Sequence, residues 1–124
     1  MSKQEDAQPE VVLARIRQYF EEYLLPCYVA KNRAYAQTDT SGDAFYNFRE
    51  GAKRWGITEE QYWGVLWGKH VHAIETWVRT GQAPDEIWRI LNDVATYCLI
   101  QITKLAADGK IDWDEVVCDG QRYP

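Results

Sequence analysis

The residue best suited to chemistry in this sequence is His70, which stands among apolar side chains. When residues 58–80 are placed at helical steps of about 100°, they form one wide apolar face with His70 near its centre. A polar ring in this position is costly unless it is hydrogen-bonded. His70 is therefore either a hydrogen-bonded core residue or a ligand-binding or proton-transfer group in an internal pocket. The face consists of Tyr62, Trp63, Leu66, Trp67, Ala73, Ile74, Trp77 and Val78.

A second group suited to chemistry lies on the helix predicted for residues 84–107. Polar residues recur there at helical spacing and form a stripe of their own. The stripe is either a solvated, salt-bridged face or, through Glu86 and Asp93, part of a metal or phosphate network. His70 and His72 are two residues apart and diverge on a helix, so they do not bind one metal together. The stripe contains Glu86, Arg89, Asp93, Tyr97 and Lys104.

Several other kinds of site are missing from the sequence. It contains no glycine-rich phosphate loop, no G-x-S-x-G and no H-E-x-x-H. Serine occurs only at Ser2 and Ser41, which argues against hydrolysis through serine. The three cysteines, Cys27, Cys98 and Cys118, are odd in number and far apart, which indicates reduced thiols in a cytoplasmic protein. We find no signal peptide and no apolar run long enough to span a membrane, so no membrane partner is expected.

Composition limits the partners further. The net charge of −5 argues against broad nucleic-acid binding, which needs a basic surface, but leaves room for a local basic pocket. The chain has 6 Trp, 8 Tyr and 3 Phe. These rings either build a core of large side chains or line a pocket for a planar ligand such as a nucleobase. So many tryptophans in 124 residues also predict a homo-oligomer, with Trp63, Trp67 and Trp88 as interface candidates.

The elements that would position these residues are all helices. We expect a flexible tail over residues 1–9 and a single helical domain over residues 10–124. The spacing predicts an antiparallel four-helix bundle with a short C-terminal tail, and we find no alternating strand pattern. Pro26 is expected to kink or end the first helix. The predicted helices are 10–36 with this interruption, 43–55, 58–80 and 84–107, followed by a loop-like tail with a short helix at 112–117.

Local signals define the ends of these helices. Thr58 and Gln61 form a capping-box pattern, and Gly81 is expected to end the helix that follows. Asp43 or Ser41 is expected to cap the preceding helix. On the 84–107 helix, the predicted core stripe contains Ile87, Leu91, Val94, Cys98, Ile102 and Leu105.

Four segments of the sequence resemble a known family. They read KNRAY at 31–35, AFYNFREGAKRW at 44–55, WGKHVHAIETWVR at 67–79 and DEIWRILNDVATY at 85–97. This order of segments resembles the small phage and prophage proteins of the nucleotide modification associated domain 1 family, which are distantly similar to the all-α MazG-like NTP pyrophosphatases. The ligand-binding positions that the resemblance implies are Lys31, Tyr35, Asn47, Phe48, Trp55, Lys69, His70, Arg79, Asp93 and Tyr97.

The chain also departs from both groups of relatives. Ala36 stands where the family usually has glycine after the tyrosine. The pyrophosphatases hold Mg²⁺ with an E-x-x-E pair on one helix and an E-x-x-D pair on the next, because a hard cation needs several carboxylate oxygens. The 43–55 helix has only Glu50, and Glu86 and Asp93 are seven residues apart. No paired-acid motif is intact. We therefore expect Mg²⁺ as a cofactor only if the protein is an enzyme, and the sequence identifies no other cofactor.

Three functions follow from these features. The first is a small phage-type nucleotide-binding protein that sequesters a nucleotide or nucleotide signal, in evasion of host defence, without chemistry. The second is a Mg²⁺-dependent nucleotide pyrophosphohydrolase of the MazG-like class, and the third is a non-catalytic adaptor for another protein. For the first, we expect Asn47, Lys69, His70, Asp93 and Tyr97 to converge on one pocket. Positive charge for phosphate would then come from Lys31 and Arg79.

Overall fold

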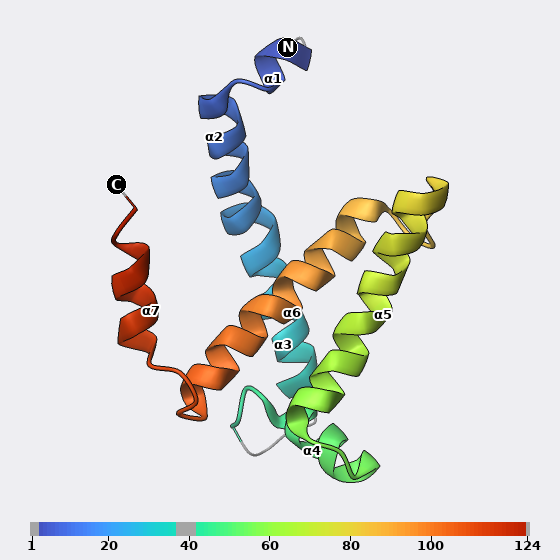
Figure 1. The fold of residues 1–124 in the computed structure, drawn as a ribbon, viewed down its shortest axis with the longest axis vertical. Helices are drawn as coiled ribbons and strands as arrows, with labels where there is room; N and C mark the ends of the chain where they lie inside the picture. The colour runs from blue at the N-terminus through green and yellow to red at the C-terminus, as the bar shows by residue number, and fades with distance from the viewer. Residues whose placement is uncertain (1–2, 37–41, 124) are drawn as a thin grey trace. The chain divides into compact units, whose positions relative to one another are not determined.

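The chain is helical throughout the part that the structure describes, residues 3–36 and 42–123, with 34–36 described by their backbone only (Figure 1). In this computed structural model, helix accounts for 80% of those residues, and no strand occurs among them. The all-α class predicted from the sequence is therefore confirmed. Two compact units make up the chain, Met1–Asn47 and Phe48–Pro124. The loop predicted from residue 37 and the cap predicted at Ser41 lie outside the described residues.

The first unit consists of helices that follow one another with little interruption. A short helix, α1 (Lys3–Asp6), lies in the segment expected to be a flexible tail. An ion pair of 3.0 Å joins Asp6 to Arg15 of α2 (Pro9–Tyr19). The π-helical segment η1 (Phe20–Leu24) and the helix α3 (Leu25–Ala36) complete the run.

Pro26 causes the interruption that the sequence predicts, but the helix continues past it. The backbone widens into η1 directly before the proline, where the N–H of Leu25 donates to the carbonyl of Phe20, five residues earlier. Proline has no N–H for the carbonyl four residues before it, and its ring needs room against the preceding turn. A π turn relieves both demands. The proline is therefore accommodated without a break between α2 and α3.

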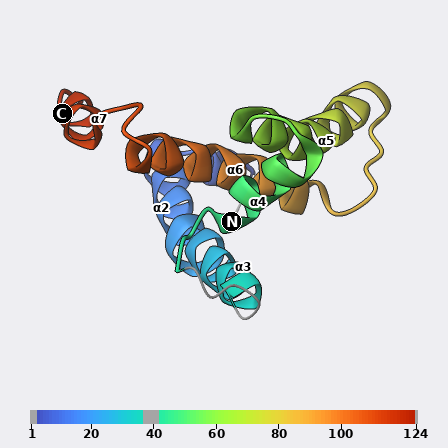
Figure 2. The ribbon, with the colours of Figure 1, turned by 90° about the horizontal axis from the view of Figure 1, so that it is seen from below.

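The second unit is built on an antiparallel hairpin of α5 (Glu59–Thr80) and α6 (Ile87–Ala107), which lie side by side (Figures 1 and 2). The predicted capping box is confirmed: the Gln61 N–H donates to the Thr58 hydroxyl at 3.0 Å, and the Thr58 N–H donates to the Gln61 side chain at 2.9 Å. Gly81 ends α5 with a φ of 74°, in the left-handed region. The predicted start and stop of this helix are both correct.

Three helices begin later than the sequence predicted, among them α6, which starts at Ile87 and not at residue 84. Helix α4 (Tyr46–Trp55) starts three residues after Asp43, whose carboxylate accepts from the Phe45 N–H at 2.9 Å in a turn that precedes the helix. Helix α7 (Trp113–Gly120) starts after Asp112, which accepts from the Asp114 N–H at 2.9 Å. In both places, an aspartate side chain satisfies backbone donors at the entrance to the helix.

The face that α6 turns towards α5 differs from the predicted core stripe. Leu91 and Ile102 of that stripe are 45% and 40% exposed. Ile90 and Lys104 are buried instead. The helix is rotated because its polar contacts with α4 and α5 draw the Lys104 side inwards, which leaves an apolar side facing outwards. The assignment of Leu91 and Ile102 to the core was therefore wrong.

Close packing between α4 and α5 depends on a glycine. Phe48 and Ala52 of α4 are buried, and the Phe48 ring meets the Tyr62 ring edge to face at 6.5 Å. Gly51 lies under the same tyrosine. A Cβ atom added at Gly51 would come within 2.2 Å of the Tyr62 ring. Any larger residue at position 51 must therefore displace the tyrosine.

We predict that Gly51→Ala destabilises the protein, although alanine favours a helix over glycine by about 1 kcal/mol. The clash with Tyr62 outweighs this gain because the ring also packs against Phe48. Urea unfolding followed by circular dichroism measures the effect. In a Tyr62→Ala background the ring is gone, and the same glycine substitution becomes neutral or stabilising. A loss of stability that is equal in both backgrounds would rule out the clash as its cause.

Candidate functional site

Four charged side chains join the three helices α4, α5 and α6. The Arg49 guanidinium lies 2.8 Å from the Glu59 carboxylate and 2.9 Å from that of Asp108. The Lys104 ammonium lies 2.7 Å from Glu59 and 2.9 Å from Asp108. Cations and anions therefore alternate around a closed circuit with no net charge. We call these four residues the charge ring.

Lys104 is the most deeply buried member of the charge ring. It is only 1% exposed, whereas the sequence placed it on a stripe that could be a solvated face. Burial disfavours the ammonium, but hydrogen bonds to Glu59 and Asp108 outweigh that cost, so the pKa of Lys104 is raised. Lys104 is therefore salt-bridged, as one interpretation of the stripe predicted, but it is buried and not solvated.

Contacts in and next to the charge ring also lower the pKa of two carboxylates, Asp108 and Glu60. Hydrogen bonds from Arg49 and then Lys104 lower the pKa of Asp108 from 3.8 to about 2. Next to the ring, Glu60 pairs with Lys110, and that hydrogen bond is the main cause of a lowered pKa at Glu60. These groups are therefore ionised over the whole neutral range.

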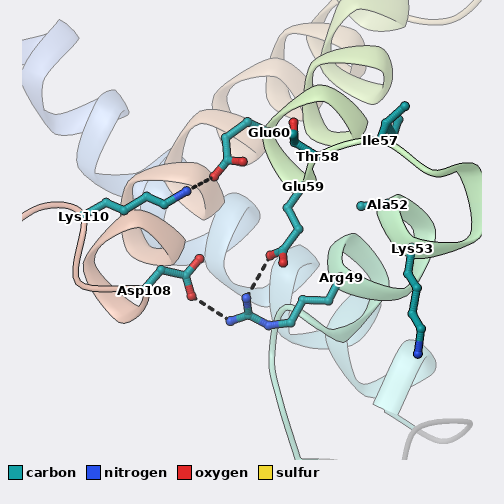
Figure 3. Close-up of a pocket in the computed structure, with 9 residues that line it drawn as sticks. All are labelled: Arg49, Ala52, Lys53, Ile57, Thr58, Glu59, Glu60, Asp108 and Lys110. Atoms are coloured by element: carbon teal, nitrogen blue, oxygen red, sulfur yellow. Dashed lines mark hydrogen bonds and ion pairs between the residues drawn. The ribbon is translucent and has the colours of Figure 1, made fainter.

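A pocket of about 490 Å³ opens beside the charge ring (Figure 3). Its wall combines charged side chains from α4, the start of α5 and the turn after α6 with a small apolar area at Ala52 and Ile57. In Figure 3, the Lys53 side chain points away from the Arg49 guanidinium. The pocket mixes cations with carboxylates, so it suits a polar ligand better than an apolar one. The charged lining residues are Arg49, Lys53, Glu59, Glu60, Asp108 and Lys110.

A second group of side chains lies further along the α5–α6 hairpin. The His70 Nδ1 atom is 3.7 Å from a carboxylate oxygen of Asp93, beyond direct hydrogen-bonding distance. The His70 and Tyr97 rings are tilted by 31°, with centroids 5.4 Å apart. Phe48 meets the same tyrosine edge to face at 6.4 Å. We call Phe48, His70, Asp93 and Tyr97 the histidine cluster.

The histidine cluster is partly open to solvent. The side chains of His70 and Asp93 are 21% and 27% exposed. Arg89, which belongs to the same polar stripe of α6, lies 3.4 Å from Asp85. An imidazole and a carboxylate that face each other, beside an aromatic ring and within reach of solvent, can bind a ligand with hydrogen-bonding edges.

One tryptophan joins the two helices of the hairpin near this cluster. The indole N–H of Trp63 donates to the Tyr97 carbonyl at 2.9 Å, from α5 to α6. The Trp63 and Trp67 rings are stacked at 5.5 Å on successive turns of α5. Trp63 therefore takes part in packing within the chain, whereas Trp88 is 44% exposed.

Three other predicted site residues of the second unit lie outside the histidine cluster. Lys69 adjoins His70 but is exposed, and Arg79 lies in the last turn of α5, about 14 Å further along the helix. Trp55 ends α4 and is 71% exposed. Lys31, Tyr35 and Asn47 belong to the first unit, and the side chain of Tyr35 lies outside the described residues. Of the seven predicted positions in the second unit, the structure thus brings four together.

The charge ring was not predicted from the sequence. Its members are separated by up to 59 residues, and no short motif links them. One signal was available: Glu59 is in the first turn of α5 and Lys104 is in the last turn of α6. In an antiparallel hairpin these two ends lie together, so the opposite charges could have been paired from topology alone.

Comparison with protein-family models, curated proteins and solved structures finds no match for this chain. In residues 3–36 and 42–123, no group of three or more His, Cys, Asp or Glu side chains is arranged to hold a metal ion. Within the same ranges, no helix is long and apolar enough to cross a membrane. The three cysteines form no disulfide.

We predict that Lys104→Met lowers the free energy of unfolding by roughly 3 kcal/mol, because it leaves two carboxylates facing a single cation. The matched control is Lys110→Met, which removes a lysine from a pair that is about half exposed and should cost less than about 1 kcal/mol. Chemical unfolding of both variants measures the difference. Equal losses would show that the burial of Lys104 has no energetic consequence.

The charge ring also predicts how stability depends on pH. Since the folded pKa of Asp108 is below its ordinary 3.8, its contribution is full above that pH and is lost as the pH falls towards 2. The folded pKa of Lys104 is raised, so its contribution is full below 10.5 and is lost as the pH rises further. Unfolding curves across this range should therefore weaken at both ends. In Asp108→Asn the acid-side slope should be shallower, and an unchanged slope would contradict this assignment.

Proposed function

We propose that this protein binds a nucleotide-like small molecule at the histidine cluster and carries out no chemistry on it. The observation that carries the proposal is the convergence of Phe48, His70, Asp93 and Tyr97 from three helices. The family resemblance marks these same four positions as ligand-binding. They are separated by up to 49 residues in the sequence, so their contact depends on the tertiary fold.

The chemistry of the cluster suits a nucleobase. A planar base can stack against the His70 and Tyr97 rings, which are tilted only 31° from each other. The Asp93 carboxylate can accept from a ring N–H or an exocyclic amine, and His70 can donate to or accept from the same edge. The His70 Nδ1 atom and the Asp93 carboxylate face each other at 3.7 Å, so the edge of one base can contact both groups.

Positive charge for a phosphate is available on the same helix. Lys69 is exposed and adjoins His70, and Arg79 is about 14 Å away along α5. A lysine binds phosphate as a flexible point charge, so the exposed Lys69 side chain can turn towards a ligand at the cluster. The assignments of Lys31, Tyr35, Asn47 and Trp55 rest on the family resemblance.

The biological setting is part of this proposal. The resemblance to the nucleotide modification associated domain 1 family supports a small phage-type protein that sequesters a nucleotide or nucleotide signal in the cytoplasm and so evades host defence. The antiparallel four-helix bundle is proposed as well. What supports it is the α5–α6 hairpin, which supplies two adjacent antiparallel helices of such a bundle.

We expect calorimetric titration against a panel of nucleoside mono-, di- and triphosphates to detect saturable binding without turnover. The titration is run with and without Mg²⁺, and product formation is followed by chromatography. Mg²⁺-dependent release of pyrophosphate would overturn the proposal in favour of the MazG-like hydrolase. Absence of any heat across the panel would overturn it in favour of a protein-interaction adaptor.

Matched variants locate the site. We predict that His70→Ala and Asp93→Ala each weaken nucleotide binding at least tenfold, whereas His72→Ala has no effect. His72 is the matched control because it lies on the same helix but is exposed on the opposite side. Lys69→Ala tests the phosphate contact, with a greater loss for triphosphates than for nucleosides. Thermal unfolding of each variant is the control for structure, and loss of stability with unchanged binding would show that the cluster is only part of the core.

A further inference from the structure

Helix α6 carries an apolar stripe on the side away from α5. Its members are exposed, although they are large or aliphatic and recur at helical spacing. Trp88, Leu91, Leu99 and Ile102 are 44%, 45%, 37% and 40% exposed. Ala95 lies at the middle of the run and is also exposed. We call these five residues the outer stripe.

The outer stripe contains no charge. The charged residues of α6 are Arg89, Asp93 and Lys104. Asp93 and Lys104 contact α5. Arg89 pairs with Asp85, and its guanidinium also lies 5.1 Å from the centre of the Trp88 ring, at one end of the stripe. From Leu91 to Ile102, a partner must therefore offer an uncharged apolar surface, since a charged one would be desolvated without compensation.

The spacing of the outer stripe is symmetric about Ala95. Successive members are separated by three, four, four and three residues, so the stripe reads the same in both directions. When two copies of such a helix lie antiparallel, Trp88 of each faces Ile102 of the other, and Leu91 faces Leu99. The small Ala95 meets itself at the centre, where the helices are closest. A surface that complements itself in this way is what a two-fold symmetric interface requires.

We propose that the outer stripe is the contact surface for a second copy of this chain, with the two α6 helices antiparallel about a two-fold axis beside Ala95. The symmetric spacing favours a second copy over an unrelated helix, which would have no reason to match it. The Trp88–Ile102 and Leu91–Leu99 pairs each occur twice in such a dimer, and the small Ala95 lies on the two-fold axis. The proposal concerns the opposite side of α6 from the histidine cluster and does not depend on the proposed ligand.

The area of this contact sets the expected affinity. With 21 residues, α6 is about 31 Å long. Contact along that length, with flanking side chains, lies near the lower bound of specific interfaces, roughly 1,200 Å² in total. We therefore expect a reversible dimer whose dissociation constant is in the micromolar range.

Sedimentation velocity of the full chain, from micromolar to near-millimolar concentration, should show a monomer–dimer equilibrium. Ala95→Glu places two like charges on the symmetry axis and should raise the dissociation constant at least tenfold. Ala107→Glu adds the same charge at an exposed position on another side of the helix and should leave it unchanged. A monomer at every concentration, or equal behaviour of the two variants, would overturn the proposal.

A charge pair tests the antiparallel register itself. Leu91→Lys alone and Leu99→Glu alone should each weaken association, because each faces a leucine in the partner. The double variant should recover much of the loss, since each introduced lysine then faces an introduced glutamate of the other copy. A parallel arrangement would place like charges opposite each other, so a double variant that is weaker than both single ones would refute the register. Circular dichroism confirms that each variant remains helical.

Discussion

The charge ring is the contact on which the arrangement of the second unit depends. It joins an arginine from α4, a glutamate from the first turn of α5, a lysine from the last turn of α6 and the aspartate that directly follows α6. Each charge has two partners of opposite sign, so removing one leaves another uncompensated. The ring fixes the rotation of α6 as well as its position. With Lys104 drawn inwards, Asp93 and Tyr97 face α5 on the same side, and the outer stripe faces away.

The rotation of α6 about its own axis thus determines the positions of both the histidine cluster and the outer stripe. The Lys104 side of α6 carries the polar residues that meet His70 and Trp63. The opposite side carries apolar residues that have no function within the hairpin. A helix that is apolar on most of its circumference usually has neighbours on more than one side. One helix can in this way contribute to a ligand site and to a contact between copies without any residue belonging to both.

Both ends of α5 could be predicted well from the sequence because their causes are local. The capping box at Thr58 and the left-handed Gly81 are determined by residues within a few positions of each other. Side-chain partners across the hairpin could not be predicted in the same way. The apolar pattern of α6 fits two different stripes, and only the contacts of Lys104 with Glu59 and Asp108 decide between them. Asn47, Lys69, His70, Asp93 and Tyr97 were predicted to converge, and contacts join three of them, His70, Asp93 and Tyr97. The charge ring was missed because no periodicity marks it.

The π-helical segment before Pro26 has a consequence for how the first unit presents its surface. A π turn holds one more residue than an α turn, so it shifts the angular phase of everything that follows by about 100°. Residues of α2 and α3 that would share a face on an uninterrupted helix therefore point in different directions. The continuous helical segment α2–η1–α3 can therefore present one surface before η1 and a different one after it, although the backbone remains helical throughout. A single proline thus gives one long helix two independent faces.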